Sequence, residues 1–371
     1  MSIDKQRLIF LLESWRPPGA PGSTGGTLYN YYLVSALSEV ADVTVFTLDA
    51  PDTRVPAGAE LHLFSEKASF LPGSRFLFWK QDLLACLPED GNDIILVTST
   101  STNAILDVAI RRGFSTVSIV QAYEDFGFKV PDGSPIKRLN SLKRLLVTGQ
   151  FFYPKIRNAG HVIVNSEYML GALTKNLGVG SNPFLLYPPL SIDINVGQIF
   201  TPDARNSIGF VNREGKNFDF VVSLAERIPE YDFLIFGHPV SDDVEVPRNV
   251  KIVGWVSDKI KMFRQAYTWI MPSLWMEPFG LVVIEAMSQG CRVGVSARGG
   301  LPEAIGNHGK VFNGFDIDEW GGWLRDGYSQ NNLDEVELRD HLHQFSLENF
   351  SATAKEYFLK IATELSMKVS T

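Results

Sequence analysis

Residues 271–305 read MPSLWMEPFGLVVIEAMSQGCRVGVSARGGLPEAI. This stretch decides the fold because its hydrophobic pattern changes from strand to helix, and then from strand to helix again. The apolar run Tyr267–Met271 ends at a proline, which predicts a buried strand followed by a turn. Helical spacing of apolar residues runs from Leu281 to Gly290, and Arg292–Ala297 then predicts a second strand.

Two strand-to-helix turns are therefore expected side by side at the carboxyl edge of a parallel sheet. The first turn carries Glu277, and the second contains Gly299 and Gly300. The amino end of a helix presents unpaired N–H groups and a partial positive charge, which suit phosphates and hydroxyls. Glycines let a ligand approach the backbone closely.

Two glutamates are the candidate ligand-binding side chains of this stretch. Glu277 precedes the predicted helix, and Glu285 lies inside it. Ionised carboxylates only accept hydrogen bonds, so a pair facing a cleft suits the vicinal hydroxyls of a sugar or ribose and suits phosphates badly. The residues alone also fit a plain alternative, in which Glu277 starts the helix and Glu285 lies on a solvated face.

The stretch resembles the donor-binding signature of the retaining glycosyltransferases of family 4, which have the GT-B fold. The resemblance rests on Glu-Pro-Phe-Gly-Leu from Glu277, Val-Ile-Glu-Ala-Met from Val283 and Gly-Gly-Leu-Pro-Glu from Gly299. In that family the glutamate that matches Glu285 holds the ribose of the nucleotide, and the one that matches Glu277 faces the donor sugar. The resemblance implies further donor contacts from the backbone amides of Phe279, Gly280 and Leu281.

The composition is that of an ordinary globular protein. The chain has 371 residues, enough for two domains, of which 45% are hydrophobic and 20% charged. A net charge of −8 argues against a nucleic-acid partner. The apolar runs are too short to span a membrane or to form a signal peptide, so we expect a cytoplasmic protein. Cys86 and Cys291 stand in apolar contexts, which predicts free thiols.

The first half of the chain alternates apolar runs with polar or helical segments. This alternation predicts a parallel sheet with helices on both faces and ligands at the carboxyl ends of its strands. The predicted strands are Leu8–Leu12, Val43–Leu48, Leu61–Phe64, Asp93–Thr98, Thr116–Gln121 and His161–Asn165.

A long Gly/Pro loop separates the first strand from a helix expected over about Thr27–Glu39. The glycines do not form the G-x-G-x-x-G pattern of dinucleotide-binding proteins, so by themselves they are weak evidence. The resemblance implies that Gly25 and Gly26 let the chain approach the donor diphosphate. The alternative is a loop that only needs a flexible backbone.

The segment Gln121-Ala-Tyr-Glu-Asp follows another predicted strand. Many family-4 enzymes place a His-Asp or similar pair here, near the reacting sugar. The segment resembles the Gln-Asp-Tyr-Glu variant of a rhamnosyltransferase-like branch, although Ala122 stands at the first acidic position. We expect Gln121 near the reaction, with Tyr123, Glu124 and Asp125 as further sugar contacts, and the alternative is a polar loop with capping carboxylates.

The segment 137–157 is basic in an otherwise acidic protein, with no carboxylate between Asp132 and Glu167. Its leucines give it an amphipathic pattern. It is a candidate for peripheral contact with an anionic membrane face or with a phosphorylated acceptor. The alternative is a solvated helix with a basic face.

Tyr187-Pro-Pro lies in the expected linker between two domains, because two prolines stiffen the chain and end a strand. We expect an amino-terminal, acceptor-binding domain over 1–187 and a donor-binding domain over 188–349. The resemblance implies that a terminal helix over about 350–371 packs back on the first domain, with a bend at Phe350–Ser351.

The second half opens with a predicted strand over Ser207–Val211 and the turn Asn-Arg-Glu-Gly-Lys-Asn. In the resembling family an Arg and a Lys here grip the diphosphate, and fixed cations stabilise the charge on a leaving diphosphate. Lys216 matches the family lysine, whereas Arg213 is a shifted partner, and the alternative is a polar turn. Further strands are predicted over Asp232–Gly237 and Asn249–Gly254, and the resemblance implies that Gly254 reads the nucleobase edge.

The whole pattern predicts an α/β protein of GT-B fold, with two Rossmann-like domains facing each other across a cleft. The resemblance implies a retaining, metal-independent glycosyltransferase that moves a hexosyl or deoxyhexosyl group from a nucleotide sugar to a carbohydrate, lipid-linked or other hydroxyl acceptor. Such enzymes serve polysaccharide or glycolipid biosynthesis. Glu277, Lys216 and Gln121 are the expected catalytic residues. No metal is expected, because no Asp-x-Asp stands in a suitable turn and no His/Cys cluster is present.

Two other functions fit the same residues. One is a non-catalytic, nucleotide-sugar-binding partner protein, which would bind donor without turnover. The other is a different GT-B enzyme, such as a sugar-nucleotide epimerase, which would need no acceptor. Intact Glu277, Glu285 and Lys216 favour the transferase over a protein that only binds donor.

Overall fold

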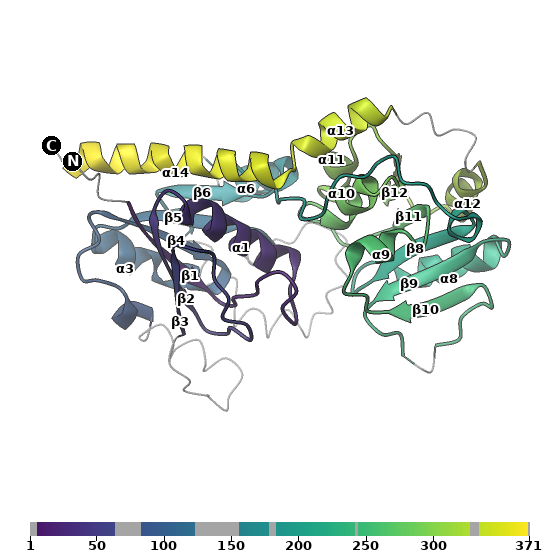
Figure 1. The fold of residues 1–371 in the computed structure, drawn as a ribbon, viewed down its shortest axis with the longest axis horizontal. Helices are drawn as coiled ribbons and strands as arrows, with labels where there is room; N and C mark the ends of the chain where they lie inside the picture. Colours follow the sequence, from purple (N-terminus) through teal and green to yellow (C-terminus); the bar gives the residue numbers. More distant parts are fainter. Residues whose placement is uncertain are drawn as a thin grey trace. The chain divides into compact units, whose positions relative to one another are not determined.

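The computed structural model describes residues 6–63, 83–122, 156–177, 183–241, 244–326 and 334–369. They divide into two compact units, each built around one parallel sheet (Figure 1). The described residues up to Pro189 and those from Leu347 onward make the first unit, and Leu190–Ser346 makes the second.

The first unit contains a seven-stranded sheet of order β3-β2-β1-β4-β5-β6-β7, and its described strand pairs are all parallel. Its inner strands are buried on both faces, which explains why their sequences are nearly continuous apolar runs. The strands are β1 Arg7–Leu12, β2 Asp42–Thr47, β3 Ala59–Leu63, β4 Ile94–Ser99, β5 Ser115–Val120, β6 His161–Val164 and β7 Pro183–Leu185.

The first helix, α1 (Gly25–Ser38), begins two residues earlier than its apolar spacing predicts. Thr24 caps it: the backbone N–H of Thr27 donates to the Thr24 hydroxyl at 3.3 Å, and the N–H of Thr24 donates to the Thr27 hydroxyl at 2.8 Å. Gly25 and Gly26 therefore belong to the first helical turn and not to the loop. Further helices of this unit before residue 190 are η1 Thr100–Ile105, α3 Leu106–Arg111 and α6 Glu167–Leu177, and residues 83–86 are also helical.

The terminal helix α14 (Leu347–Val369) belongs to the core of the first unit. Its buried residues recur every three or four positions and pack with residues of α1 and the sheet. The expected bend at Phe350–Ser351 is wrong, because Phe350 lies inside the helix with its ring edge against Tyr29, at 5.2 Å between ring centroids. The buried residues of α14 are Phe350, Ala354, Tyr357, Phe358, Ile361 and Leu365.

The second unit contains a six-stranded parallel sheet of order β10-β9-β8-β11-β12-β13. The strand order reverses between β8 and β11, so the segments that follow these two strands meet at one edge. The strands are β8 Ser207–Asn212, β9 Asp232–Gly237, β10 Val250–Gly254, β11 Thr268–Met271, β12 Arg292–Ser296 and β13 Lys310–Phe312. The helices are α7 Pro202–Arg205, α8 Phe218–Arg227, α9 Lys259–Phe263, α10 Leu281–Ser288, α11 Leu301–Ile305, α12 Ile317–Asp326 and α13 Glu335–His343.

The structure contains a strand at every position that the sequence predicts, with ends that differ by no more than two residues. β7, with three residues, is the strand expected before the Tyr187-Pro-Pro linker, for which the sequence pattern sets no bounds. β13, also with three residues, was missed because it is too short to show a pattern. Both cysteines are free thiols, and Cys291 is buried. Within the described ranges, no helix combines the length and hydropathy needed to cross a membrane.

Candidate functional site

Lys216 and Glu277 form an ion pair at the carboxyl edge of the second sheet. Lys216 follows β8 and Glu277 follows β11, which are the strands on either side of the reversal in strand order. Both side chains are largely buried, with 20% of the Lys216 side chain and 12% of the Glu277 side chain exposed. The structure thus joins two residues that stand sixty-one positions apart in the sequence.

Ser273 supports the Glu277 carboxylate from the end of β11. Its hydroxyl donates to Glu277 Oε1 at 2.9 Å, and it is itself fully buried. Oε1 therefore receives hydrogen bonds from both Lys216 and Ser273, whereas Oε2 accepts none from the described residues. The second oxygen of Glu277 is the one left for a ligand.

The turn that carries Glu277 packs directly on the next strand-to-helix turn. Glu277 forms an isolated bridge with Gly299, and the N–H of Gly300 donates to the Glu277 carbonyl at 2.7 Å. Gly299 has a φ of +64°, and a Cβ there would collide with the backbone of Glu277. Glycine is required at this position by both the backbone angle and the close approach.

Glu285 is buried in the middle of α10, and only 4% of its side chain is exposed. This finding rules out the alternative in which Glu285 lies on a solvated helix face. Its Oε1 is paired with the ammonium of Lys259, the first residue of α9. Its Oε2 accepts no hydrogen bond from the described residues. A buried carboxylate is stable only with such a partner.

The other residues predicted to contact the donor differ in which of their groups a ligand could reach. Phe279 is buried and packs against Phe345, at 5.2 Å between ring centroids, so only its backbone is available to a ligand. Gly280 has a φ of +115° and directly precedes α10. Gly254 ends β10 with a φ of +80° and open space beside it. Arg213 is exposed, and its guanidinium forms no hydrogen bond or ion pair with the described residues.

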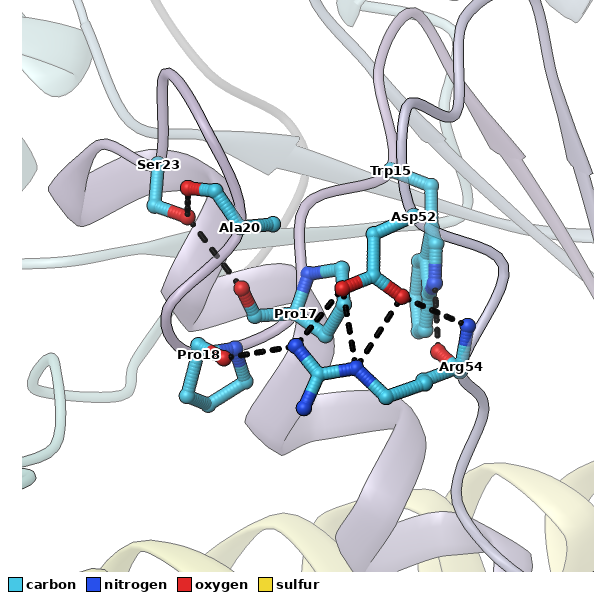
Figure 2. A network of polar contacts seen from close by, with 7 residues as sticks. All are labelled: Trp15, Pro17, Pro18, Ala20, Ser23, Asp52 and Arg54. Atoms are coloured by element: carbon cyan, nitrogen blue, oxygen red, sulfur yellow. Dashed lines mark hydrogen bonds and ion pairs between the residues drawn. The ribbon is translucent and has the colours of Figure 1, made fainter.

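In the first unit, the loop before α1 is held by hydrogen bonds and is not simply a flexible segment. Figure 2 shows Arg54 reaching from the segment after β2 to the carbonyl of Pro18, at 3.0 Å, while its guanidinium also contacts Asp52. The indole of Trp15 donates to the carbonyl of Arg54 at 3.0 Å (Figure 2). The hydroxyl of Ser23 donates to the carbonyl of Ala20 at 2.7 Å.

Gln121 lies against the first turns of α1. Its Nε2 donates to Asn30 Oδ1 at 2.8 Å, and a Cβ at Gly26 would stand 2.6 Å from Gln121 Oε1. A side chain at residue 26 would therefore have to displace the end of the Gln121 side chain. The structure brings Gln121 and Gly26 together within the first unit.

Several predicted residues lie outside the described part of the chain. They are Tyr123, Glu124, Asp125 and all of the basic segment 137–157 before residue 156. Arg157, near the end of that segment, is exposed.

Solved glycosyltransferase structures have a similar arrangement of strands and helices. Sucrose-phosphate synthase from Thermosynechococcus elongatus has a TM-score of 0.72 at 16% identity, over 96% of this chain and 100% of that one. The fold is GT-B. WaaG, a glycosyltransferase involved in lipopolysaccharide biosynthesis, shares this GT-B fold with a TM-score of 0.64 at 15% identity, over 94% of this chain and 98% of that one. Alr3699/HepE from Anabaena, in complex with UDP, has a TM-score of 0.62 at 14% identity, over 95% of this chain and 100% of that one.

Sequence similarity to known families is concentrated in the second GT-B unit. The family model of glycosyl transferases group 1 matches residues 195–320, which include Lys216, Glu277 and Glu285. The D-inositol 3-phosphate glycosyltransferase of Mycobacterium ulcerans is 29% identical over 153 residues, which are 35% of this chain and 33% of that protein. The protein of the same name from Mycobacterium sp. strain KMS is 28% identical over 198 residues, 44% of each. The chain thus spans less than half the length of these curated relatives.

Sequence reasoning missed Lys259 and Ser273 as partners of the two glutamates. Ser273 follows the proline that ends the predicted strand, and nothing in the local sequence around Lys259 marks it as a ligand-site residue. Twenty-six positions separate Lys259 from Glu285, and no local pattern connects two residues that far apart.

Among the described residues, no three His, Cys, Asp or Glu side chains gather as metal ligands would.

Proposed function

We propose that this protein is a retaining glycosyltransferase that moves a sugar from a nucleotide-sugar donor to a hydroxyl acceptor. The observation that carries the proposal is the pair of largely buried carboxylates at the carboxyl edge of the second sheet, each held by its own lysine. Buried ionised groups of this kind are expensive to keep unless they serve a ligand or a structural network.

In this proposal the two carboxylates bind different parts of the donor. Glu285 Oε2 accepts hydrogen bonds from the ribose hydroxyls, and Glu277 Oε2 accepts them from hydroxyls of the sugar. Both oxygens are free of described protein donors, which supports these roles. Neutral hydroxyl groups are suitable donors to acceptor-only carboxylates. Gly254 and the backbone N–H groups before and within the first turn of α10 complete the donor contacts.

Lys216 stabilises the leaving diphosphate. An ammonium group carries three N–H donors, and Glu277 uses one of them, so the others remain for phosphate oxygens. The bond between the anomeric carbon and the phosphate oxygen breaks, and the acceptor oxygen bonds to the same carbon on the same face. The acceptor proton passes to the leaving phosphate oxygen. Arg213 is a further candidate to meet the diphosphate.

The finer features of the proposal come from the family resemblance. They are membership of family 4, transfer of a hexosyl or deoxyhexosyl group without a metal ion, and a role in polysaccharide or glycolipid assembly. A cytoplasmic location is proposed from the short apolar runs of the sequence, and peripheral membrane contact from the basic, amphipathic pattern of 137–157. The absence of a required metal is tested by chelation: activity should survive treatment with EDTA. Loss of activity that Mg²⁺ or Mn²⁺ restores would contradict metal independence.

The first experiment is a panel of UDP-, GDP-, dTDP- and ADP-sugars, with thermal stability and nucleoside diphosphate release measured for each. A bound donor at ~100 times its Kd should stabilise the protein by about 2.7 kcal/mol. Glu285→Gln should abolish this stabilisation. Lys216→Met should lower turnover by about 10²–10³-fold, which is typical of losing one group that stabilises developing charge.

Lys310→Met is the matched control, because Lys310 begins β13 at the opposite edge of the sheet and has an exposed side chain. Donor binding without release, even with acceptors, would indicate a nucleotide-sugar-binding partner protein. Formation of a new nucleotide sugar without an acceptor would indicate an epimerase. The proposal fails if no nucleotide sugar binds.

A further inference from the structure

Within the described part of the chain, the carboxylate of Glu285 has a single hydrogen-bond donor. The ammonium of Lys259 contacts Oε1, and no other described residue donates to either carboxylate oxygen. Glu277 differs, because its Oε1 also accepts a hydrogen bond from Ser273. Without its lysine Glu277 would keep one fixed donor, whereas Glu285 would keep none.

A hydrogen bond to one oxygen of a glutamate decides where the other oxygen points. The torsion that orients the carboxylate is broad, so a group without a partner turns easily and its two oxygens are interchangeable. In Glu285 the fixed oxygen is Oε1, and the oxygen left to a ligand is Oε2. Only 4% of this side chain is exposed, so water has little access to replace the lysine.

The backbone that carries Lys259 is held firmly in the second unit. Lys259 is the first residue of α9, and the Asp258 carboxylate caps this helix by accepting from the N–H of Lys261 at 3.0 Å. Phe263, at the other end of α9, is fully buried with its ring edge against Trp269 of β11, at 4.8 Å between ring centroids. A fixed base lowers the entropy cost of holding the lysine side chain in one place.

Lys259 does not pair with the carboxylate nearest to it in the sequence. Asp258 caps α9 and forms an ion pair with Lys261 at 3.4 Å. Lys259 keeps 36% of its side chain exposed, and water can solvate an exposed ammonium well. The pair with Glu285 therefore benefits the buried carboxylate more than the lysine.

We propose that Lys259 is a positioning residue for the nucleotide: it holds Glu285 Oε1 so that Oε2 accepts hydrogen bonds from the ribose hydroxyls. The inference rests on the proposed function, which assigns the ribose to Glu285, and it adds the residue that orients this contact. Lys259 acts through Glu285 and takes no part in bond making. A nucleotide without ribose hydroxyls gains nothing from Lys259, because Oε2 then has no hydroxyl to accept from.

The test compares UDP, GDP and ADP with their dideoxyribose analogues, which lack both ribose hydroxyls. Dissociation constants are measured by isothermal titration calorimetry on the full-length protein. We expect the wild type to bind at least one of these diphosphates about tenfold or more tightly than its analogue. Lys259→Met should weaken binding of that diphosphate about tenfold and leave binding of the dideoxy analogue unchanged.

Turnover gives a second readout that a purely structural role would not produce. With a sugar donor of the same nucleotide, Lys259→Met should raise KM and leave kcat unchanged, because the ribose contact is the same in the ground state and the transition state. Lys251→Met is the matched control. Lys251 pairs with Asp232 in the same unit at 2.6 Å, with both side chains exposed, and its loss should change binding of neither ligand.

Lys259→Gln is the milder variant and decides the question if Lys259→Met is unfolded at the temperature of the titration. An amide still donates to Oε1, but the hydrogen bond loses the assistance of the charge. We expect the preference for the ribose form to fall in this variant without disappearing. A preference equal to that of the wild type would contradict the role of the lysine.

Equal weakening of a diphosphate and its dideoxy analogue in either variant overturns the inference, because Lys259 would then act on another part of the nucleotide or on folding alone. A wild type that binds both forms equally overturns it as well, and leaves the transferase function standing if sugar is still transferred. Failure of the transferase function gives a different result. The protein then prefers the ribose form, as this inference expects, but transfers no sugar, and if none of the three diphosphates binds, both proposals are wrong.

Discussion

At the scale of single residues, the buried carboxylate of Glu285 is a group that needs a compensating charge. Its counter-ion, Lys259, keeps 36% of its side chain exposed, so water screens the pair on one side only. Without the lysine, the carboxylate would be left buried with no compensating charge. The pair is therefore the most informative place to test the site through stability.

We predict that Lys259→Met destabilises the protein by roughly 1–3 kcal/mol, less than a fully buried pair would lose because the lysine is partly solvated. Lys259→Met combined with Glu285→Gln should recover part of the loss, since no charge is then left unpaired. The measurement is the melting temperature of the four members of this cycle. Lys251→Met, which breaks an exposed pair with Asp232, should cost less than about 1 kcal/mol, and an equal loss there would contradict the argument.

A second residue-scale prediction concerns His341 on α13. Burial lowers the pKa of His341 below the ordinary value of 6.5, and nearby His308 lowers the pKa further, whereas the hydrogen bond to the carbonyl of Ala304 opposes both effects. The ring is held in its neutral form, because Nε2 contacts the Ala304 carbonyl and Nδ1 contacts Gln344 Nε2, each at 2.9 Å.

The unfolded chain therefore binds a proton at His341 more tightly than the folded protein does. The stability that this histidine contributes is complete above pH 6.5 and is lost as the pH falls toward the lower folded-state pKa. We expect His341→Gln to show a smaller loss of unfolding free energy than the wild type between about pH 8 and about pH 5. Urea titrations at both pH values measure this difference, and identical losses would refute the prediction.

At the scale of elements, the two adjacent strand-to-helix turns depend on one glycine. Gly299→Ala should destabilise the second unit by at least about 2 kcal/mol, because the positive φ and the collision with Glu277 act together. The substitution should also weaken donor binding, since the backbone of Glu277 must move. Thermal unfolding and a donor titration measure the two effects.

Gly322→Ala provides the control within the same unit. Gly322 lies inside α12 with open space beside it, so alanine there should stabilise the protein by about 0.5–1 kcal/mol. A Gly299→Ala protein as stable as the wild type would show that the turn adapts. The steric account of the Gly-Gly-x-x-Glu pattern would then be wrong.

At the scale of the whole molecule, each unit has hydrophobic clusters of its own, and α14 completes one of those in the first unit. Phe358→Ala should cost about 3–5 kcal/mol, because Phe358 is 4% exposed within that core. Its neighbour Leu359 is 55% exposed, so Leu359→Ala should change stability by no more than about 0.5 kcal/mol.

Hydrogen exchange tells which core responds. In Phe358→Ala, amides of β1 and α1 should lose protection, while those of β8 and β11 keep it. Equal loss in both sheets would mean that the two units unfold as one.

Part of the candidate site was predictable because it lies in one short stretch. Glu277, Gly299 and Glu285 were identified from local spacing and from a family resemblance that residues 271–305 carry. That Lys216 and Glu277 lie close to each other also follows from the strand order, once a parallel sheet is assumed. The partners Lys259 and Ser273 could not be predicted, because a hydrogen bond depends on where a side chain points after the helices are placed.

The sequence by itself determined the alternation of strands and helices, because burial on both faces of a parallel sheet requires continuous apolar runs that any reader can find. The glycines in the sequence also marked the tight turns, since a left-handed backbone angle or a close backbone contact leaves little choice but glycine. Only the tertiary structure decided which charges pair, that Glu285 is buried, and that Gln121 lies against α1. Those outcomes come from packing between segments that are distant in the chain, which local periodicity does not encode.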